Sequence, residues 1–504
     1  MQPDFGRVLN PQTETPLLKA LQSCVQKPHA PFYTPGHKRG QGIPASLAAL
    51  LGAQVFQADL PELPELDNLF APQGVIQEAQ ALAAGAFGAD RTWFLTNGST
   101  AGVIAAILAT CNPGDKIILP RNVHQSAVSG LILSGAVPIF IQPDYDPTLD
   151  LAHSLTPAAI AEALAQHPDA KAVLMVYPTY YGVCGDVAAI AQLAHQHNMP
   201  LLVDEAHGAH FAFHPELPIA ALTAGADLVV QSTHKVLSAM TQAAMLHTRG
   251  DRVKGDRISK ALQLVQSTSP SYLLLASLDA ARHQMATQGK QLLEYTLQLA
   301  DEARSRLDQI PGLSTLKPEQ AGTAGFIALD RTRLTVTVTG LGISGFAADA
   351  ILNEQLGVTA ELPSLQHLTF IVSVGNTSAD LEALVQAFGA LAAMQGETAE
   401  TQRRREKQRP SSLILHPLSF IPPSSLLTPR DAFFAATEAV PVAQAVNRIS
   451  AELICPYPPG IPVLMPGEVI SAEAIASLQT ILAIGGTISG CADSSLGTLR
   501  IVLC

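Results

Sequence analysis

The chain has 504 residues, of which 47% are hydrophobic and 14% are charged, and its formal net charge is −12. This composition excludes an intrinsically disordered protein. The negative charge gives no electrostatic reason to bind nucleic acid or an anionic membrane. No signal-peptide pattern and no apolar run long enough to span a bilayer is found. We therefore expect a cytoplasmic protein of several domains, with no nucleic-acid and no membrane partner.

The first predicted elements are an N-terminal arm over 1–30, with one helix around Pro16–Gln26, and then a long region in which strands alternate with helices. The strands are predicted at Lys116–Leu119, Val137–Ile141, Ala172–Tyr177, Pro200–Asp204, Ala226–Gln231 and Ala243–His247, and helices at Val123–Ser134 and Asp186–His197. Strands separated by helices form βαβ units, so the sequence predicts an α/β fold with a mostly parallel sheet covered on both faces.

After about residue 250 the pattern becomes helical, and a smaller α+β unit follows, ending in a strand at Leu368–Ser373. A charged run, Gln402 to Arg409, reads as a solvated linker rather than a nucleic-acid patch. The predicted organisation is an arm (1–30), a large domain (31–310), a small α+β domain (311–395), a linker (396–413) and a C-terminal α+β domain (414–504).

Cysteine and histidine spacing argues against disulfides and metal. The six cysteines are scattered without a C-x-x-C pair, so we expect reduced thiols. His207, His210 and His214 stand close together, but their spacing and the neighbouring phenylalanines favour packing over zinc binding. We expect no metal site.

Unusual polar residues follow several predicted strands, and ligands of parallel α/β sheets bind at the carboxyl ends of the strands. Asp204 closes one apolar strand, and Lys235 follows the next one. A pyridoxal 5′-phosphate (PLP) enzyme needs this pair, because a lysine amine forms a Schiff base with the cofactor and a carboxylate keeps its ring nitrogen protonated. Asp204–His207 also spells a helicase box, but that interpretation fails because the chain has no G-x-x-x-x-G-K-[ST] phosphate loop.

Two further segments fit such a cofactor. Thr96–Gly102 places Gly98, Ser99 and Thr100 at the start of a helical stretch, where free backbone N–H groups and hydroxyls form an anion site suited to a phosphate. An ordinary helix cap is the alternative. Ser232 adds a hydroxyl, and His124 follows a strand at a position suited to lie over the ring of the cofactor.

Five motifs together resemble the bacterial ornithine/lysine/arginine decarboxylases of PLP fold type I, over about residues 30 to 470. They are Tyr-Thr-Pro-Gly-His-Lys (33–38), Leu-Pro-Glu-Leu-Asp (63–67), Arg-Asn-Val-His (121–124), Gln-Ser-Thr-His-Lys (231–235) and Pro-Tyr-Pro-Pro-Gly-Ile-Pro (456–462). The resemblance implies an aspartate-aminotransferase-like large domain with smaller domains after it. The chain lacks the N-terminal wing of the long members, and Asp-Glu-Ala-His (204–207) resembles the short forms.

The resemblance also implies roles for individual residues. It implies Lys235 as the Schiff-base lysine, Asp204 at the pyridine nitrogen, His124 stacked on the ring and His207 near the 3′-oxygen. His234 is a candidate for substrate binding or proton delivery. The phosphate would be bound by Gly98, Ser99, Thr100 and Ser232, with Ser267 and Thr268 reaching it from a neighbouring subunit, and His37 would contact the substrate. A shared site implies a homodimer or a larger even-numbered assembly.

Decarboxylation rather than transamination is expected from the late small-domain strand. Many aminotransferases of this fold clamp the substrate α-carboxylate there with an arginine, whereas Phe370–Asn376 contains none. An unclamped carboxylate in an apolar setting leaves more readily as CO2, although Arg39 or Arg121 could supply the clamp. Lys235 or His234 would then protonate Cα. The alternatives are an aminotransferase, another PLP lyase, or a non-catalytic PLP-binding homologue.

A basic L-amino acid is the expected substrate, with arginine first and lysine or ornithine next. Its distal cation needs a carboxylate, and a bidentate pair would suit a guanidinium. The acidic residues of the C-terminal segment are Glu438, our first candidate, with Asp431 and Glu468.

Overall fold

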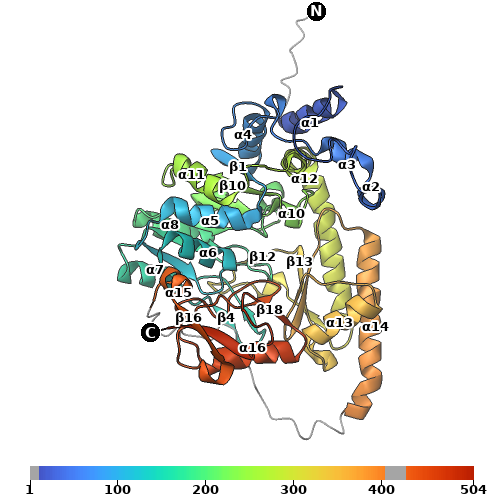
Figure 1. Cartoon of the computed structure of the whole chain (residues 1–504). Helices are drawn as coiled ribbons and strands as arrows, with labels where there is room; N and C mark the ends of the chain where they lie inside the picture. Colours follow the sequence, from blue (N-terminus) through green and yellow to red (C-terminus); the bar gives the residue numbers. More distant parts are fainter. Residues whose placement is uncertain (1–10, 403–426, 504) are drawn as a thin grey trace, which may run out of the picture.

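The computed structural model describes residues 11–402 and 427–503 (Figure 1). The large domain begins with α1 (Pro16–Gln26), α2 (Ala45–Leu51), α3 (Ala53–Ala58), α4 (Val75–Phe87), β1 (Arg91–Leu95), α5 (Gly98–Thr110), β2 (Lys116–Pro120), α6 (Gln125–Ser134), β3 (Val137–Ile141), β4 (Tyr145–Asp146) and β5 (Leu151–Ala152). It continues with α7 (Pro157–Gln166), β6 (Ala172–Val176), β7 (Val183–Cys184), α8 (Val187–Gln196), β8 (Leu201–Asp204), α9 (Ala221–Ala224), β9 (Leu228–Gln231), α10 (Thr233–Val236), β10 (Ala244–Thr248), α11 (Gly255–Val265) and the long helix α12 (Tyr272–Leu307).

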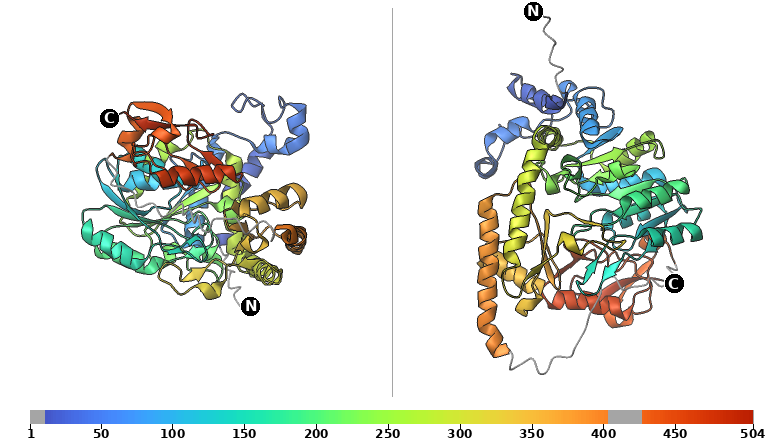
Figure 2. Two further views of the ribbon diagram at one scale, coloured as in Figure 1. Left: turned by 90° about the horizontal axis from the view of Figure 1, so that it is seen from below. Right: turned by 180° about the vertical axis from the view of Figure 1, so that it is seen from behind.

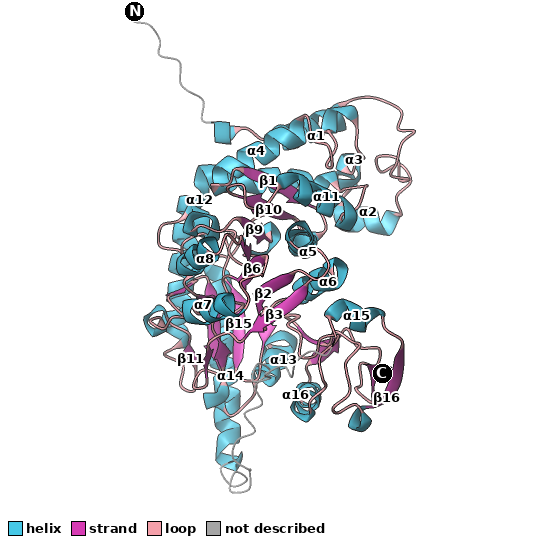
Figure 3. Cartoon of the chain, turned by 90° about the vertical axis from the view of Figure 1, so that its left-hand side faces the viewer, coloured by secondary structure: helices cyan, strands magenta, loops and turns pink. Residues whose placement is uncertain are grey.

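A seven-stranded sheet in the order β1-β10-β9-β8-β6-β2-β3 forms the centre of the large domain. The pairs from β9 to β3 are parallel, and β10 pairs antiparallel with both β9 and β1. Successive residues of each strand point to opposite faces, so Ile117 and Leu119 join one core cluster while Ile118 joins the other. Figure 3 shows helices α5 and α6 on one face of the sheet and α7 and α8 on the other. The predicted mostly parallel α/β fold is confirmed.

Helix α12 connects the large domain to the small one, where its C-terminal half packs beside α14 (Figure 2, right). The remaining elements of the small domain are β11 (Ser314–Thr315), β12 (Ala328–Leu329), β13 (Arg333–Thr337), α13 (Gly345–Gln355), β14 (Leu362–Pro363), β15 (His367–Ile371) and α14 (Ser378–Gln402). The antiparallel order β11-β13-β15-β14 places β13 in the sheet interior. Arg333, the first residue of β13, is therefore directed from the small domain toward the large one.

The C-terminal domain contains α15 (Pro429–Phe434), β16 (Thr437–Pro441), β17 (Cys455–Tyr457), α16 (Ala472–Ala483), β18 (Thr487–Ser489) and β19 (Thr498–Val502). Its own core surrounds Ile454, Leu478 and Ile501. Helix α15 packs on α6 of the large domain, and Arg430 donates to the carbonyl oxygens at the end of α6. This domain therefore rests on the helix that follows β2.

The structure also bears on the predicted linker, the cysteine thiols, membrane-spanning helices and metal sites. Helix α14 continues to Gln402, beyond the predicted start of the linker at residue 396, because the residues there are mostly good helix formers; residues 403–413 of that linker lie outside the described part. Cys24, Cys111, Cys184, Cys455 and Cys491 are all free. In the two described ranges, no helix combines the length and apolarity that crossing a bilayer requires, and no group of side chains there could hold a metal ion.

Candidate active site

The carboxyl ends of β2, β6, β8 and β9 open into one cavity of about 460 Å³ between the three domains. This size is in the range of small-molecule sites. The large domain supplies most of the lining, the small domain adds Arg333 and Glu361, and the C-terminal domain adds the 457–459 segment. Nine of the site residues predicted from the sequence line this cavity: Gly98, Ser99, Thr100, His124, Asp204, His207, Ser232, His234 and Lys235.

Lys235 and Asp204 share this cavity. Lys235 lies on the short helix α10 after β9, and its Nζ is 3.0 Å from Nε2 of His207. Asp204 ends β8 and accepts a hydrogen bond from the backbone N–H of Ala206 at 3.2 Å. Burial lowers the pKa of Lys235, and the carboxylate of Asp204 opposes that shift. Burial likewise raises the pKa of Asp204, against the attraction of Lys235. The two groups thus interact electrostatically across a largely buried cavity.

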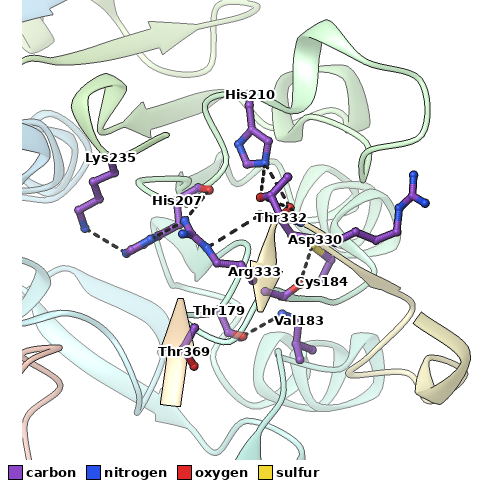
Figure 4. Close-up of polar contacts among 12 residues, drawn as sticks. Thr179, Val183, Cys184, His207, His210, Lys235, Asp330, Thr332, Arg333 and Thr369 are labelled. Atoms are coloured by element: carbon purple, nitrogen blue, oxygen red, sulfur yellow. Dashed lines mark hydrogen bonds and ion pairs between the residues drawn. The ribbon is translucent and has the colours of Figure 1, made fainter. Parts of the chain in front are cut away.

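His207 belongs to a buried polar network that crosses the domain boundary (Figure 4). Nη2 of Arg333 donates to Nδ1 of His207 at 2.8 Å and to its carbonyl oxygen at 3.2 Å. Asp330 lies behind the arginine, 3.9 Å from its Nε. The same carboxylate accepts from Thr332 at 2.7 Å and contacts Nε2 of His210 at 3.2 Å. Burial lowers the pKa of His207 well below its usual value, helped by Lys235 and Arg333. His207 is therefore a neutral imidazole between the side chains of Lys235 and Arg333.

His124 forms the N-cap of α6, where its Nδ1 accepts from the backbone N–H of Ser126 at 3.2 Å. Burial lowers the pKa of His124 to about 4, and Lys235 contributes to this shift. The ring is therefore neutral at ordinary pH. Gly460 of the C-terminal domain lies against it: a Cβ at Gly460 would be 3.2 Å from Nε2 of His124. A loop of the third domain thus packs closely against this imidazole.

The N-terminus of α5 forms a cradle with hydroxyl groups at one end of the cavity. Gly98 has a φ of +73°, which glycine adopts without strain. The backbone N–H of Gly98 donates to the carbonyl oxygen of Gln242 at 3.0 Å. Among the described residues, no side chain caps this helix, so the N–H groups that follow Gly98 suit an anion. Ser232 donates from its hydroxyl to that of Ser99 at 2.7 Å. This arrangement matches what a phosphate monoester needs.

His234, next to Lys235, has a defined tautomer. Its Nδ1 lies 2.8 Å from the carbonyl oxygen of Ala243, which can only accept, so Nδ1 carries the proton. Burial lowers the pKa of His234, so the ring is neutral and its Nε2 is an available base at the cavity wall.

Other predicted residues are not brought to this cavity within one chain. Glu438 lies on β16 and forms an ion pair with Arg448 at 3.0 Å. Asp431 accepts from Thr428, the N-cap of α15. His37 pairs with Asp59 at 3.1 Å in the N-terminal region. Ser267 is exposed and donates from its backbone N–H to Asn97, beside the phosphate cradle but outside the cavity lining.

The suggested arginine clamps are also engaged elsewhere. Arg121 is buried against Glu468 of the C-terminal domain, with Nη2 and Oε2 3.0 Å apart. Arg39 donates to the carbonyl oxygens of Lys27 and Val25. Neither guanidinium lines the cavity.

Arg333, Glu361 and Tyr180 line the cavity without having been predicted. Arg333 and Glu361 belong to the small domain, about a hundred residues beyond Lys235, and no local motif marks them. Arg333 pairs in register with Ile371, so the small-domain sheet does bring an arginine to the site, on the strand beside the predicted one. Its Nη2 donates to His207 and its Nε lies 3.9 Å from Asp330, while Nη1 has no hydrogen-bond partner among the described residues.

Comparison with known proteins assigns the chain to a family. The model of the Orn/Lys/Arg decarboxylase major domain matches residues 15–380, and that of the C-terminal domain of the same family matches residues 421–490. The chain belongs to the Orn/Lys/Arg decarboxylase family. It is 41% identical to a protein named arginine decarboxylase from Bacillus subtilis, with 97% of this chain and 98% of the relative covered. It is 26% identical to lysine decarboxylase LdcA of Pseudomonas aeruginosa, with 90% and 73% covered.

Solved structures of this decarboxylase family share the fold. The lysine decarboxylase LdcF of Francisella novicida superposes with a TM-score of 0.83 at 23% identity, covering 98% of this chain and 82% of the other. A ureidoglycine-glyoxylate aminotransferase from Bacillus subtilis superposes with a TM-score of 0.51 at 13% identity, covering 64% of this chain and 85% of the other. The predicted fold type I architecture is confirmed, and the cofactor of this decarboxylase is PLP.

Proposed function

We propose that this protein decarboxylates L-arginine to agmatine and CO2, with PLP bound through Lys235. Decarboxylation of a basic amino acid follows from membership of the family. The choice of arginine rests on the relatives of about 40% identity, several of which are named arginine decarboxylase. The observation that carries the residue assignment is the enclosure of one lysine amine and one buried carboxylate in the same cavity, at the carboxyl edge of the sheet.

The residues of the cavity fit the cofactor. The uncapped start of α5 and the hydroxyls of Ser99 and Ser232 suit its phosphate. Asp204 would pair with the ring nitrogen, and His124 would lie on the ring face, with Gly460 behind it. His207 would face the 3′-oxygen. When bound, PLP supplies an electron sink for the carbon that loses CO2.

The chain itself supplies a nucleophilic amine, a fixed negative charge and neutral bases. Burial keeps a larger fraction of Lys235 uncharged at neutral pH, and only an uncharged amine can attack a carbonyl group. His234 is held with Nδ1 protonated, which leaves Nε2 able to accept a proton and later return it. We therefore assign proton transfer at the reacting carbon to Lys235 or His234, and the holding of the ring charge to Asp204.

Loss of CO2 is supported by two features of the site: the lack of a free arginine in the segments considered as a clamp, and the apolar part of the cavity wall. No arginine occurs in Phe370–Asn376, and Arg39 and Arg121 are engaged with other parts of the chain. Pro178, Leu362 and the Pro458–Pro459 segment give the cavity wall an apolar part. A carboxylate there is poorly solvated and leaves more readily as neutral CO2.

Glu361 is our candidate for the distal cation of the substrate. Among the described residues lining the cavity, Asp204 and Glu361 carry the carboxylates, and Glu361 is exposed at the rim. Its negative charge acts on both Lys235 and Arg333 by raising their pKa. A carboxylate can bind a guanidinium with two parallel hydrogen bonds, so Glu361 replaces Glu438 in this role.

The substrate test measures release of labelled CO2 from arginine, lysine and ornithine by the purified protein. We expect arginine to give the highest kcat/KM, and Lys235→Ala to abolish both turnover and the visible absorption of the bound cofactor. Glu361→Gln should raise KM for arginine about tenfold or more, since a hydrogen bond to a charged group contributes about 1.5–3 kcal/mol. Glu354→Gln, an exposed charge on α13 away from the cavity, is the matched control.

Three results would each refute a part of this assignment. Transfer of the amino group to a keto acid without CO2 release would make the protein an aminotransferase. An unchanged absorption spectrum in Lys235→Ala would remove the lysine from the proposal. Equal effects of Glu361→Gln and Glu354→Gln on KM would remove Glu361.

We also propose a homodimer, or a larger even-numbered assembly, in which Ser267 approaches the site of the partner subunit. Ser267 is exposed, and the N-terminal region exposes Phe32, Leu50 and Leu51, as an interface between copies requires. Light scattering should give at least twice the mass of the chain, 53.0 kDa. A monomer that retains full activity would exclude a shared site.

A further inference from the structure

His207 has two different neighbours on its two ring nitrogens. Nη2 of Arg333 lies 2.8 Å from Nδ1, and Nζ of Lys235 lies 3.0 Å from Nε2. A guanidinium can only donate hydrogen bonds, because it does not lose its proton in proteins. Nδ1 of His207 must therefore accept, and the ring proton of the neutral imidazole must be on Nε2.

This tautomer determines the direction of the hydrogen bond between His207 and Lys235. With the proton on Nε2, His207 donates toward the nitrogen of Lys235, and that nitrogen must present a lone pair. The contact therefore stabilises the uncharged amine and disfavours the ammonium form. Burial and the charge of Arg333 lower the pKa of Lys235 in the same direction.

The small domain holds Arg333 in this position and supplies its counter-charge. Arg333 is 1% exposed, and Asp330 lies 3.9 Å from its Nε. Although burial alone would raise the pKa of Asp330, His210 and Arg333 hold it below the usual value, so the carboxylate stays charged. Asp330 thus provides the counter-charge that allows a guanidinium to remain buried.

The backbone leaves room for this arrangement at Gly182. A Cβ there would lie 2.7 Å from Cβ of Arg333, and the residue has a φ of +86°. The carbonyl oxygen of Gly182 also accepts from the backbone N–H of Asp330 at 2.8 Å. A bulkier residue at this position would displace the strand start that carries Arg333.

We propose that Arg333 is a positioning residue that fixes His207 as the neutral Nε2–H tautomer and thereby keeps Lys235 in its reactive, uncharged form. This inference rests on the proposed role of Lys235. Nη2 of Arg333 donates to Nδ1 of His207, so through this contact the guanidinium acts on the reaction by way of the histidine. Nε and Nη1 of Arg333 have no hydrogen-bond partner among the described residues.

The test measures the pKa of the Lys235 amine in the full-length, cofactor-free protein. Acetylation by acetic anhydride is followed as a function of pH, and modification of the peptide containing Lys235 is quantified by mass spectrometry. Arg333→Met should raise this pKa by about one pH unit or more, because it removes a nearby positive charge and frees the histidine to accept from the ammonium. Arg333→Lys, which keeps a charged donor, should retain most of the wild-type value.

A double-mutant cycle separates the histidine from the bare charge. His207→Leu alone should raise the pKa of Lys235, and Arg333→Met should have a clearly smaller effect in that background. Arg331→Gln removes a more exposed arginine, paired with Glu216 and Asp301, and should leave the titration unchanged.

An unchanged pKa in Arg333→Met, an equal shift with and without His207, or an equal shift in Arg331→Gln would each overturn the proposal. If Arg333→Met does not fold, the comparison of Arg333→Lys and His207→Leu with wild type decides. CO2 release by the wild-type enzyme is measured separately, so a failure of the proposed reaction is distinguishable from a failure of this inference.

Discussion

Removal of the carboxylate of Glu468 should destabilise the protein strongly, because it leaves a charge buried between two domains. Oε2 of Glu468 lies 3.0 Å from Nη2 of Arg121, and the two side chains are 8% and 4% exposed. The same oxygen accepts from the backbone N–H of Met465 at 2.9 Å. Breaking a buried pair on one side costs about 3–5 kcal/mol.

The other contacts of Arg121 determine how much stability Glu468→Ala loses within this range. Its guanidinium also donates to the carbonyl oxygens of Pro462 at 2.8 Å and Val463 at 3.1 Å. These bonds remain in Glu468→Ala, so we expect about 3 kcal/mol. Glu468→Gln keeps an acceptor oxygen and should cost less. The double variant Arg121→Met/Glu468→Met removes both charges and should be more stable than Glu468→Ala.

Urea unfolding of the full-length protein measures these differences, and m-values are compared to verify that the same surface is exposed. Titration with PLP provides the second assay, since Arg121 ties the 462–463 segment to the strand end that leads to His124. Weaker cofactor binding should accompany the lost stability in Glu468→Ala. A cost below about 1 kcal/mol in that variant would place the pair among ordinary surface ion pairs and refute the reasoning.

Three further outcomes are expected from the same structure. Gly460→Ala should weaken PLP binding severalfold in a titration, because its φ is +87° and a Cβ would lie 3.2 Å from Nε2 of His124; unchanged affinity would contradict this. Asp204→Asn should lower kcat about 10- to 1000-fold, equivalent to a change of 1–3 pK units on the group it pairs with; a smaller loss would exclude the ring-nitrogen role. Burial lowers the pKa of His247 to about 3, below its value in the unfolded chain. The unfolded state therefore binds the extra proton first, and stability should fall by about 2–3 kcal/mol between pH 7 and pH 4.5. His247→Gln should reduce that slope in urea unfolding at the two pH values.

The large domain could be predicted from sequence because its elements are short, apolar and separated by clear turn signals. The helix at Pro16–Gln26 and the strand at Val137–Ile141 have the predicted bounds. The carboxyl-edge rule then brings His124, Asp204 and Lys235 to one place, because parallel strands end at the same edge. The sheet topology alone was enough to predict that these three residues lie together.

The small-domain contribution could not be predicted, because it depends on how two domains face each other. Arg333 and Glu361 stand in segments without a recognisable motif, and the antiparallel register of β13 with β15 decides that Arg333 begins its strand at the cavity. The segment predicted to carry the clamp, Phe370–Asn376, begins on the neighbouring strand, β15. Periodicity cannot distinguish these two strands, since both are buried in the same sheet.

Acidic residues of the C-terminal domain illustrate a second limit. Glu438, Asp431 and Glu468 are equivalent in sequence as candidates for binding a cation. The structure pairs the first with Arg448, uses the second at a helix N-terminus and buries the third against Arg121. Partner choice among charges depends on distances across the fold, which composition does not encode.

The site combines several groups whose charges are suppressed by the same cause. Burial lowers the pKa of Lys235, His124 and His207, so that one amine and two imidazoles are driven toward their neutral forms in a single cavity. Asp204 is the opposing charge, and its attraction for the ammonium form would by itself make Lys235 a poorer nucleophile. Arg333 acts in the other direction from the small domain. The reactivity of the lysine therefore depends on the docking of that domain, and a change that separates β13 from His207 should reduce it even when every residue of the large domain is intact.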